Sequence, residues 1–441
     1  MIGDLRISGS HSFPFSESDI RVNFKNPCKI IAAANANVLD EVGQGQFCSS
    51  DGGTTWSQTS LPFIPGDVLH SDPNVDWTSD GTGWAITIGI DDSITNFQLR
   101  SYISSDGGAS WVFNSTASGD QTAADKPMMW IDHSPTSRFK DNIYLIWHNN
   151  EPVFVNRRAG VSGTWQTPIQ VSGSETTGTG IGGDIKSNSV GDVFAFWPDT
   201  GSQKLLVSKS TDGGVTFGTP VTITITFAAF QILVPADAFR GVLVYTSGGA
   251  FRDATHDLVY VVWTDLTGEQ GCSSGIGPGT DVSATCKSRI WFSRSTDGGG
   301  SWEPARMINN QSSLNDQFNP KLAVDESNGA LMVIYYDTVS DLERLKTDVW
   351  MQTSFDNGAT WSVAKKVTSA ETDETGNGAD VPNAGFFGDQ YGDYNGLSGY
   401  CGVFFPSWTD RRSGGREEIW TAPIGRADIS RRLIELVAAT V

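Results

Sequence analysis

The chain has 441 residues, of which 38% are hydrophobic and which include 15 Trp and 23 Phe, too many large apolar side chains for a disordered protein. Lys and Arg number 30 against 50 Asp and Glu, and the resulting net charge of −20 argues against a nucleic-acid or anionic-membrane partner. No run of 18 apolar residues occurs, so we expect no membrane span.

One eight-residue pattern, Ser-x-Asp-x-Gly-x-Thr/Ser-aromatic, recurs five times along the chain. Its copies cover residues 49–56, 104–111, 210–217, 295–302 and 354–361. The Asp carboxylate can accept backbone N–H groups of a tight turn, the Gly supplies a positive φ, and the aromatic ring can enter the core. We therefore interpret the repeat as a structural hairpin turn and not as a catalytic motif.

The spacing of these turns predicts the architecture. The repeated aspartates are Asp51, Asp106, Asp212, Asp297 and Asp356, separated by 55, 106, 85 and 59 residues. The interval of 106 equals two repeats with one decayed turn, for which residues 158–165 have the right place. Strand-like runs precede the turns, and no helical period occurs before residue 425. Repeats of about 50 residues with four short strands are typical of β-propeller blades.

Counting first strands predicts an all-β propeller of seven blades, with six blades as the alternative. The predicted blade starts are residues 19–22, 72–75, 125–127, 184–185, a site near Asp237, 319–321 and 389–393. The last blade lacks an outer strand, which residues 5–10 can supply to close the ring. We expect residues 1–424 to form this single domain and residues 425–441 to be a tail, either non-native or a docked helix.

Five cysteines are too few for a disulfide framework. Cys272 and Cys286 share one Gly/Ser-rich loop, and Cys28 and Cys48 end two successive predicted strands, so either pair can form a disulfide; Cys401 is left over. A disulfide would indicate a secreted, periplasmic or otherwise extracellular protein, and five buried thiols in a cytosolic chain are the alternative.

The five turns resemble the Asp-box, or BNR, repeat of sialidases and sialidase-like propellers. Residues 26–27, 125–127 with Asp132, 392–397 and 408–412 also resemble secreted sialidase-like glycosidases. The resemblance implies a propeller with a glycoside hydrolase site at the axial mouth. Sialidases carry an Arg-Ile-Pro motif in the first blade, whereas the nearest strings here, residues 5–8 and 20–22, contain no Pro. Asp-boxes also occur in lectins and sorting receptors, so the fold does not decide the function.

Several predicted first strands begin with an acidic residue, and first strands line a propeller's axis, so these carboxylates should converge at one mouth. They are Asp19, Asp72, Asp125, Asp184, Asp237 and Asp389. Converging carboxylates can form an acid/base pair at a glycosidic bond, bind Ca²⁺, or only cap the next strand through its backbone N–H groups.

Asp393 and Tyr394 place a carboxylate beside a phenol that it can activate as a nucleophile. We predict Asp393, Tyr394, Asp125 and Asp72 as catalytic residues. The predicted substrate-binding residues are Arg21, Asp184, Asp389, Arg411 and His148.

Arg21 and Arg411 can clamp a substrate carboxylate or merely neutralise acidic neighbours. His148, taken with His133, is similar to the proton-transferring histidines of propeller polysaccharide lyases, or it is an ordinary loop histidine.

Three functions follow from these residues. The first is a sialidase-like glycoside hydrolase, the second a glycan-binding propeller without catalysis, and the third a lyase for uronate-containing polysaccharides. An enzyme predicts unmatched polar residues at one mouth, at least one with a shifted pKa, whereas a lectin predicts one similar pocket in each blade. We expect a monomer with a carbohydrate partner and no required cofactor, Ca²⁺ being the alternative ligand of the mouth.

Overall fold

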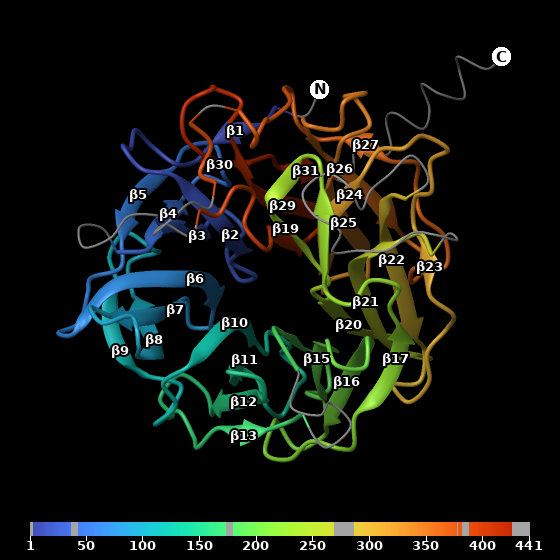
Figure 1. Ribbon diagram of the computed structural model, residues 1–441. Coiled ribbons are helices and arrows are strands. Elements are labelled where there is room, and N and C mark those ends of the chain that lie inside the picture. Colours follow the sequence, from blue (N-terminus) through green and yellow to red (C-terminus); the bar gives the residue numbers. More distant parts are fainter. Residues whose placement is uncertain are drawn as a thin grey trace.

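A computed structural model describes residues 3–36, 43–172, 180–268, 286–376, 378–381 and 388–425. Its strands form eight antiparallel sheets, of which seven are arranged as a ring around one axis and the eighth is a two-stranded hairpin (Figure 1). The predicted all-β propeller of seven blades is therefore confirmed, and the alternative of six blades is wrong. The described residues form no helix, and hence none that is long and apolar enough to cross a membrane.

Blades 1 to 6 are four-stranded meanders in which the strands follow one another from the axis to the rim. Blade 1 contains β2 (Phe15–Val22), β3 (Ile30–Ala36), β4 (Gly45–Ser49) and β5 (Ser57–Ser60), and blade 2 contains β6 (Asp67–Trp77), β7 (Gly83–Asp91), β8 (Phe97–Ser104) and β9 (Val112–Thr116). Blade 3 contains β10 (Ala124–Ile131), β11 (Ile143–Asn149), β12 (Val153–Arg158) and β13 (Ile169–Gln170), and blade 4 contains β14 (Asp184–Ser187), β15 (Val193–Asp199), β16 (Lys204–Ser210) and β17 (Val221–Ile225). Blade 5 contains β20 (Ser247–Arg252), β21 (Asp257–Leu266), β22 (Ser288–Ser295) and β23 (Arg306–Met307), and blade 6 contains β24 (Gln317–Val324), β25 (Leu331–Asp337), β26 (Asp348–Ser354) and β27 (Lys365–Lys366).

Blade 7 joins the two ends of the propeller. It contains β28 (Gly396–Tyr400), β29 (Val403–Asp410), β30 (Glu418–Thr421) and β31 (Ile424–Gly425), together with β1 (Leu5–Arg6) from the start of the chain. The outer strand is β1, which pairs antiparallel with β30. The first strands of successive blades contact one another in order, and β28 contacts β2, so the inner ring is continuous.

The five repeated turns join the third and fourth strands of blades 1, 2, 4, 5 and 6. At Asp51, Oδ1 accepts the backbone N–H groups of Thr54 and Thr55 at 3.0 and 2.9 Å, and Oδ2 accepts the Thr55 hydroxyl at 2.6 Å. These hydrogen bonds, above all those from Thr55, lower the pKa of Asp51 to about 2. In blade 3 the predicted decayed turn lies between β12 and β13, where Arg158 pairs with Trp165.

The turns also distinguish the two ends of the channel. Because strands alternate in direction within each blade, the turn after the third strand lies at the end where the first strand finishes. We call this the Asp-box end. We call the opposite end, where the first strands begin, the mouth.

Two predicted blade starts are wrong. Asp237 begins β19 (Asp237–Leu243), which forms a separate hairpin with β18 (Gln231–Val234), and blade 5 starts at β20. The apolar side chains of this hairpin join the buried core of blades 4 to 7, and its sequence therefore has the same apolar pattern as a blade strand. Residues 389–393 precede β28, which begins at Gly396, and they form a turn in which Gln390 and Gly392 have positive φ values of 46° and 73°.

Four first strands carry the same β-bulge near their start, in blades 1, 2, 3 and 6. The bulged residues are Glu17, Asp72, Lys126 and Asn319, whose φ values are 53°, 57°, 53° and 49°. Pro follows three of the four residues. A bulge re-aims its side chain, so one equivalent position in four blades presents four different residues near the mouth.

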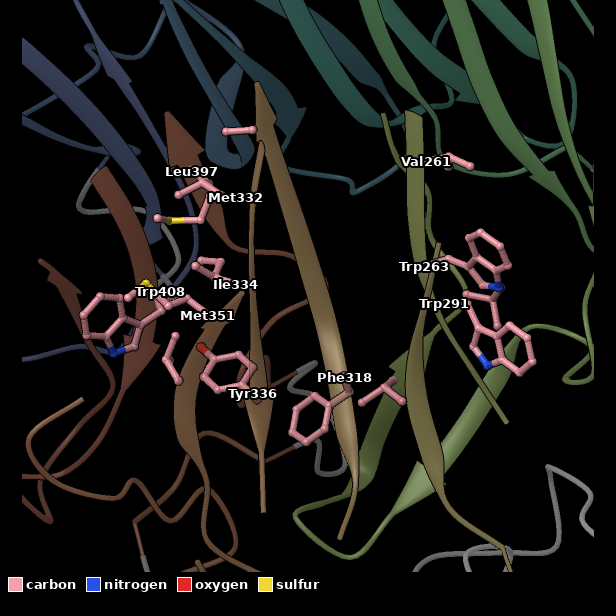
Figure 2. Packing of buried hydrophobic residues seen from close by; sticks show 14 of the residues in the cluster. Val261, Trp263, Trp291, Phe318, Met332, Ile334, Tyr336, Met351, Leu397 and Trp408 are labelled. Carbon is pink, nitrogen blue, oxygen red and sulfur yellow. The ribbon is translucent and has the colours of Figure 1, made fainter. Parts of the chain in front are cut away.

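The core lies between neighbouring blades and holds the first strands in place. Figure 2 shows Ile334 of blade 6 beside Trp408 of blade 7. Both belong to one buried cluster that also includes residues of blade 5. There Trp263 and Trp291 stack with ring centroids 6.4 Å apart. This packing fixes the axis around which the polar residues gather.

The predicted pairing of Cys28 with Cys48 is wrong, since both thiols are free. Cys48 lies against Gly108 of the neighbouring blade instead of turning toward Cys28. Cys286 carries a disulfide bond. Cys272 lies outside the described residues, as does the predicted tail from residue 426 on, so these two predictions stay predictions.

Candidate active site at the channel mouth

Five carboxyl groups from blades 1, 2, 3 and 7 gather at the mouth, and we call them the mouth cluster. They are Glu17, Asp72, Asp125, Asp389 and Asp393. Glu17 Oε1 accepts the backbone N–H of Asp393 at 3.0 Å, and its Oε2 accepts the Asn35 amide at 2.7 Å. Asn35 Oδ1 in turn accepts the backbone N–H of Asp72 at 2.8 Å. The cluster is thus tied together by backbone and amide groups of three blades.

The β18–β19 hairpin, inserted between blades 4 and 5, reaches this cluster from across the ring, and β19 lies near the ring's centre in Figure 1. Arg240 on β19 donates to Asp389 Oδ1 at 2.9 Å, to Asp393 Oδ1 at 3.0 Å and to Glu17 Oε1 at 3.2 Å. Its backbone N–H donates to Gln390 Oε1 at 3.0 Å. The hairpin therefore covers part of the mouth and supplies a cation to three carboxyl groups.

Two members of the mouth cluster have raised pKa values. Burial, together with the charges of Asp389 and Asp393, raises the pKa of Glu17 well above its ordinary value. Burial and then the charge of Asp125 raise the pKa of Asp72 to about 7. Asp389 and Asp393 pair with Arg240, as Glu17 does. Carboxyl groups with raised pKa values and carboxyl groups paired with a cation therefore lie side by side, which is the asymmetry that acid/base catalysis needs.

The capping interpretation is confirmed for three of the acidic residues. Asp72 Oδ2 accepts the backbone N–H of Lys126 at 3.0 Å, and Asp19 Oδ2 accepts that of Val75 at 3.0 Å. Asp184 Oδ2 accepts the N–H of Gly248 at 2.8 Å and also pairs with Lys186. Asp19 and Asp184 therefore connect neighbouring first strands by hydrogen bonds in the channel wall, and they lie apart from the mouth cluster.

Tyr394 lies beneath the mouth cluster, and its ring carries the Lys126 ammonium 3.4 Å from the ring centroid. Its buried hydroxyl has no hydrogen-bond partner among the described residues. Burial, reinforced by the charges of Asp72 and Glu17, raises the pKa of Tyr394 well above its ordinary value. The expected hydrogen bond from Tyr394 to Asp393 is not formed within the described part of the chain.

The two arginines expected to bind substrate lie outside the mouth cluster. Arg21 pairs with Asp19 at 3.0 Å and lines a cavity toward the Asp-box end. Arg411 donates to the carbonyl oxygens of Gly415 and Asp373 at 2.8 and 2.6 Å. Arg21 therefore neutralises an acidic neighbour, which was the alternative interpretation, and no arginine clamp forms from these two residues.

The two histidines lie at opposite ends of blade 3. His148 is opposite Asp125 on β11, with its Nε2 3.6 Å from that carboxylate, at the mouth. His133 follows the end of β10 and bridges Asp76 at 2.9 Å and Glu326 at 2.7 Å. Burial opposes the shift, but the charges of Asp76 and Glu326 raise the pKa of His133 to about 10. The two histidines cannot share one substrate sugar.

Sequence reasoning missed Glu17, Lys126 and Arg240. Lys126 could have been found from the sequence, because it precedes Pro127 as Asp72 precedes Pro73. Glu17 occupies the same bulge position but precedes Ser18, so this signal does not mark it. Nothing in the sequence around Arg240 reveals its role, since it belongs to an insertion between blades. Among the described residues, no group of three or more His, Cys, Asp or Glu is arranged to hold a metal ion, and the Ca²⁺ alternative stays a prediction.

No protein-family model and no curated protein matches this sequence. Among solved structures, the chain is similar to a protein of unknown function from Dyadobacter fermentans, with 12% identity, a TM-score of 0.47, and 96% of this chain and 97% of that chain covered. It is similar to an α-L-arabinofuranosidase from Fusarium graminearum, with 11% identity, a TM-score of 0.48 and 94% of each chain covered. It is also similar to a Hadza microbial sialidase, with 15% identity, a TM-score of 0.46, and 74% of this chain and 64% of that chain covered.

Proposed function

We propose that the protein is a carbohydrate-active enzyme, a glycoside hydrolase whose active site is the mouth cluster. One observation carries this proposal: carboxyl groups with raised pKa values and carboxyl groups paired with Arg240 meet at a single mouth. Hydrolysis of a glycosidic bond needs one carboxylic acid to protonate the leaving oxygen and one carboxylate to activate water or attack the sugar.

In this proposal Asp72 is the general acid, since a pKa of about 7 matches proton donation near neutral pH. Asp393 is the partner carboxylate, and its ion pair with Arg240 holds it in place. Tyr394 offers a hydroxyl with an open hydrogen-bonding position to the bound sugar. Asp125, whose side chain is 61% exposed at the rim, contacts the part of the glycan outside the mouth.

The bulge position supports an enzyme over a lectin with one pocket per blade. In four blades that position holds Glu17, Asp72, Lys126 and Asn319, so the blades contribute different chemistry to one site. A lyase is supported less well, because His133 and His148 lie at opposite ends of blade 3. Export of the protein, indicated by the disulfide at Cys286, belongs to the same proposal.

The test is a screen of labelled glycosides and uronate polysaccharides with wild-type protein, Asp72→Asn, and Asp120→Asn at an exposed surface site. We expect hydrolysis of at least one glycoside, a loss of about 100-fold or more in Asp72→Asn, and wild-type rates in Asp120→Asn. Products with an unsaturated sugar end would favour the lyase. Glycan binding without turnover would favour the lectin.

A further inference from the structure

Four cationic side chains line the channel, each from the first strand of a different blade. They are Arg21 on β2, Lys126 on β10, Lys186 on β14 and Lys321 on β24, and all are 3–6% exposed. Lys321 lines the cavity beneath the mouth together with Lys126. It also lines the next cavity along the axis, together with Lys186 and Arg21. Lys321 therefore lies between the other cations.

These cations differ in their partners. Arg21 pairs with Asp19, Lys186 pairs with Asp184, and Lys126 lies over the Tyr394 ring. The Lys321 ammonium forms no hydrogen bond or ion pair with any of the described residues, although it interacts electrostatically with the Asp184 carboxylate. Asp184 is already paired with Lys186, and a buried cation without an ion pair of its own is unfavourable. The wall of the channel thus concentrates positive charge at Lys321.

The positive charge of Lys321 affects the pKa values of the two neighbouring lysines. Burial lowers the pKa of Lys126 to about 8 and that of Lys186 to about 8, and the positive charge of Lys321 acts in the same direction on both. An anion placed between them would remove this mutual repulsion.

The cavity beneath the mouth also presents hydrogen-bond donors. Tyr394 and Thr246, which are 6% and 8% exposed, line this cavity. Their hydroxyls have no hydrogen-bond partner among the described residues. Asp393 lines the same cavity, but its carboxylate is held by Arg240. The side chain of Asn319 is anchored through its amide nitrogen to the Gly392 carbonyl at 2.8 Å. Two ammonium groups and two free hydroxyls therefore converge on one space.

We propose that Lys321, Lys126 and the hydroxyls of Tyr394 and Thr246 form a binding site for one anionic group inside the channel. The cavities on the two sides of Lys321 measure about 20 and 40 Å³, enough for one small ion or one carboxylate but not for a whole sugar. The group is either a free anion such as chloride or the carboxylate of a sugar acid seated in the mouth. The site does not depend on the mouth cluster being catalytic.

The first experiment compares the melting temperatures of wild type and Lys321→Met in sodium HEPES, whose anion is too large for the cavity, and in sodium chloride at the same ionic strength. Lys321→Met removes the unpaired charge and keeps the apolar stem, so we expect it to melt higher than wild type in HEPES. Chloride should raise the melting temperature of wild type and not that of Lys321→Met, since only the folded wild type binds the ion. Lys140→Met, at a partly exposed lysine beside Asp141, should respond as wild type does.

The second experiment separates the two sources of the anionic group by adding sodium glucuronate, sodium acetate or glucose. If glucuronate stabilises wild type more than acetate or chloride does, and if Lys321→Met binds glucuronate at least tenfold more weakly, the site is assigned to a sugar acid. Equal responses to all three anions, again lost in Lys321→Met, would assign it to a free ion. The proposal is overturned if Lys321→Met melts below wild type in HEPES and both proteins respond equally to every anion. None of these outcomes depends on glycoside turnover.

Discussion

Arg240 on β19 and Glu17 on β2, 223 residues apart in the chain, lie 3.2 Å apart across the channel mouth. The contact joins an insertion between blades 4 and 5 to the first strand of blade 1. It brings a cation to a carboxyl group that burial would otherwise leave isolated. Access to the mouth cluster is therefore coupled to the position of the hairpin.

Replacing Arg240 should destabilise the protein in a pH-dependent way. Arg240→Gln removes the cation from three carboxyl groups, so they repel one another when ionised. We expect a loss of about 2 kcal/mol in unfolding free energy at pH 8 and a smaller loss at pH 5, where the raised pKa of Glu17 favours its neutral form and weakens the repulsion. Urea unfolding at both pH values measures this. Arg252→Gln, at a 43% exposed pair with Asp257, is the control, and equal losses in both variants would contradict the prediction.

Asp72 should make the folded protein less stable as pH rises. Its pKa is about 7 in the folded protein and about 4 when exposed in the unfolded chain, so the folded state binds more protons between these values. Stability contributed by this group is therefore present below pH 4 and falls as pH rises to 7, by about 2 to 4 kcal/mol. The difference between the unfolding free energies of wild type and Asp72→Asn, followed from pH 4 to 8, measures the slope. A difference that stays constant over this range would refute the assignment.

Tyr394→Phe should separate activity from stability. The Tyr394 hydroxyl donates to no described residue, so its removal should change the unfolding free energy by less than about 1 kcal/mol. If the hydroxyl binds or reacts with the sugar, turnover should be lost. Asp393→Asn should also abolish turnover but cost more stability, because it breaks the pair with Arg240. Full activity in both variants would exclude them from the active site.

Gly108 should tolerate no side chain, whereas Gly52, a glycine of another repeat that lies one position earlier in the motif, should tolerate one. An alanine Cβ at Gly108 would approach Ile31 Cγ2 to 2.7 Å and Cys48 Cβ to 2.9 Å, at a φ of 95°. We expect Gly108→Ala to cost about 3 kcal/mol, since backbone strain and overpacking add. Gly52→Ala, at a φ of 72° with no atom within 4 Å, should cost about 1 kcal/mol. Similar losses in urea unfolding would disprove the role of this blade contact.

Chelation should leave the protein's stability unchanged. Carboxyl groups at the mouth already pair with Arg240 or accept backbone N–H groups, so they do not require a metal ion as a positive partner. We expect the melting temperature to be the same in EDTA and in millimolar Ca²⁺. A rise with Ca²⁺ that Asp125→Asn abolishes would restore the Ca²⁺ alternative for the mouth.

The sequence by itself determined the repeat and its spacing, because each repeated turn is made by contacts within eight residues. Asp51 binds Thr54 and Thr55, three and four positions away, and such local hydrogen bonds leave a fixed spacing in the sequence. This spacing also located acidic residues near the starts of first strands, of which Asp72 and Asp125 lie at the mouth.

Only the tertiary structure decided which of these residues work together. Asp19 and Asp184 have the same sequence signal as Asp72, yet they cap neighbouring strands inside the wall, because their depth along the channel depends on how the blades pack. Arg240 acts through a contact between segments far apart in the chain, for which no local pattern exists. Charge pairing across a ring depends on the closed geometry of all seven blades, and this is why the site, unlike the turns, could not be read from the sequence.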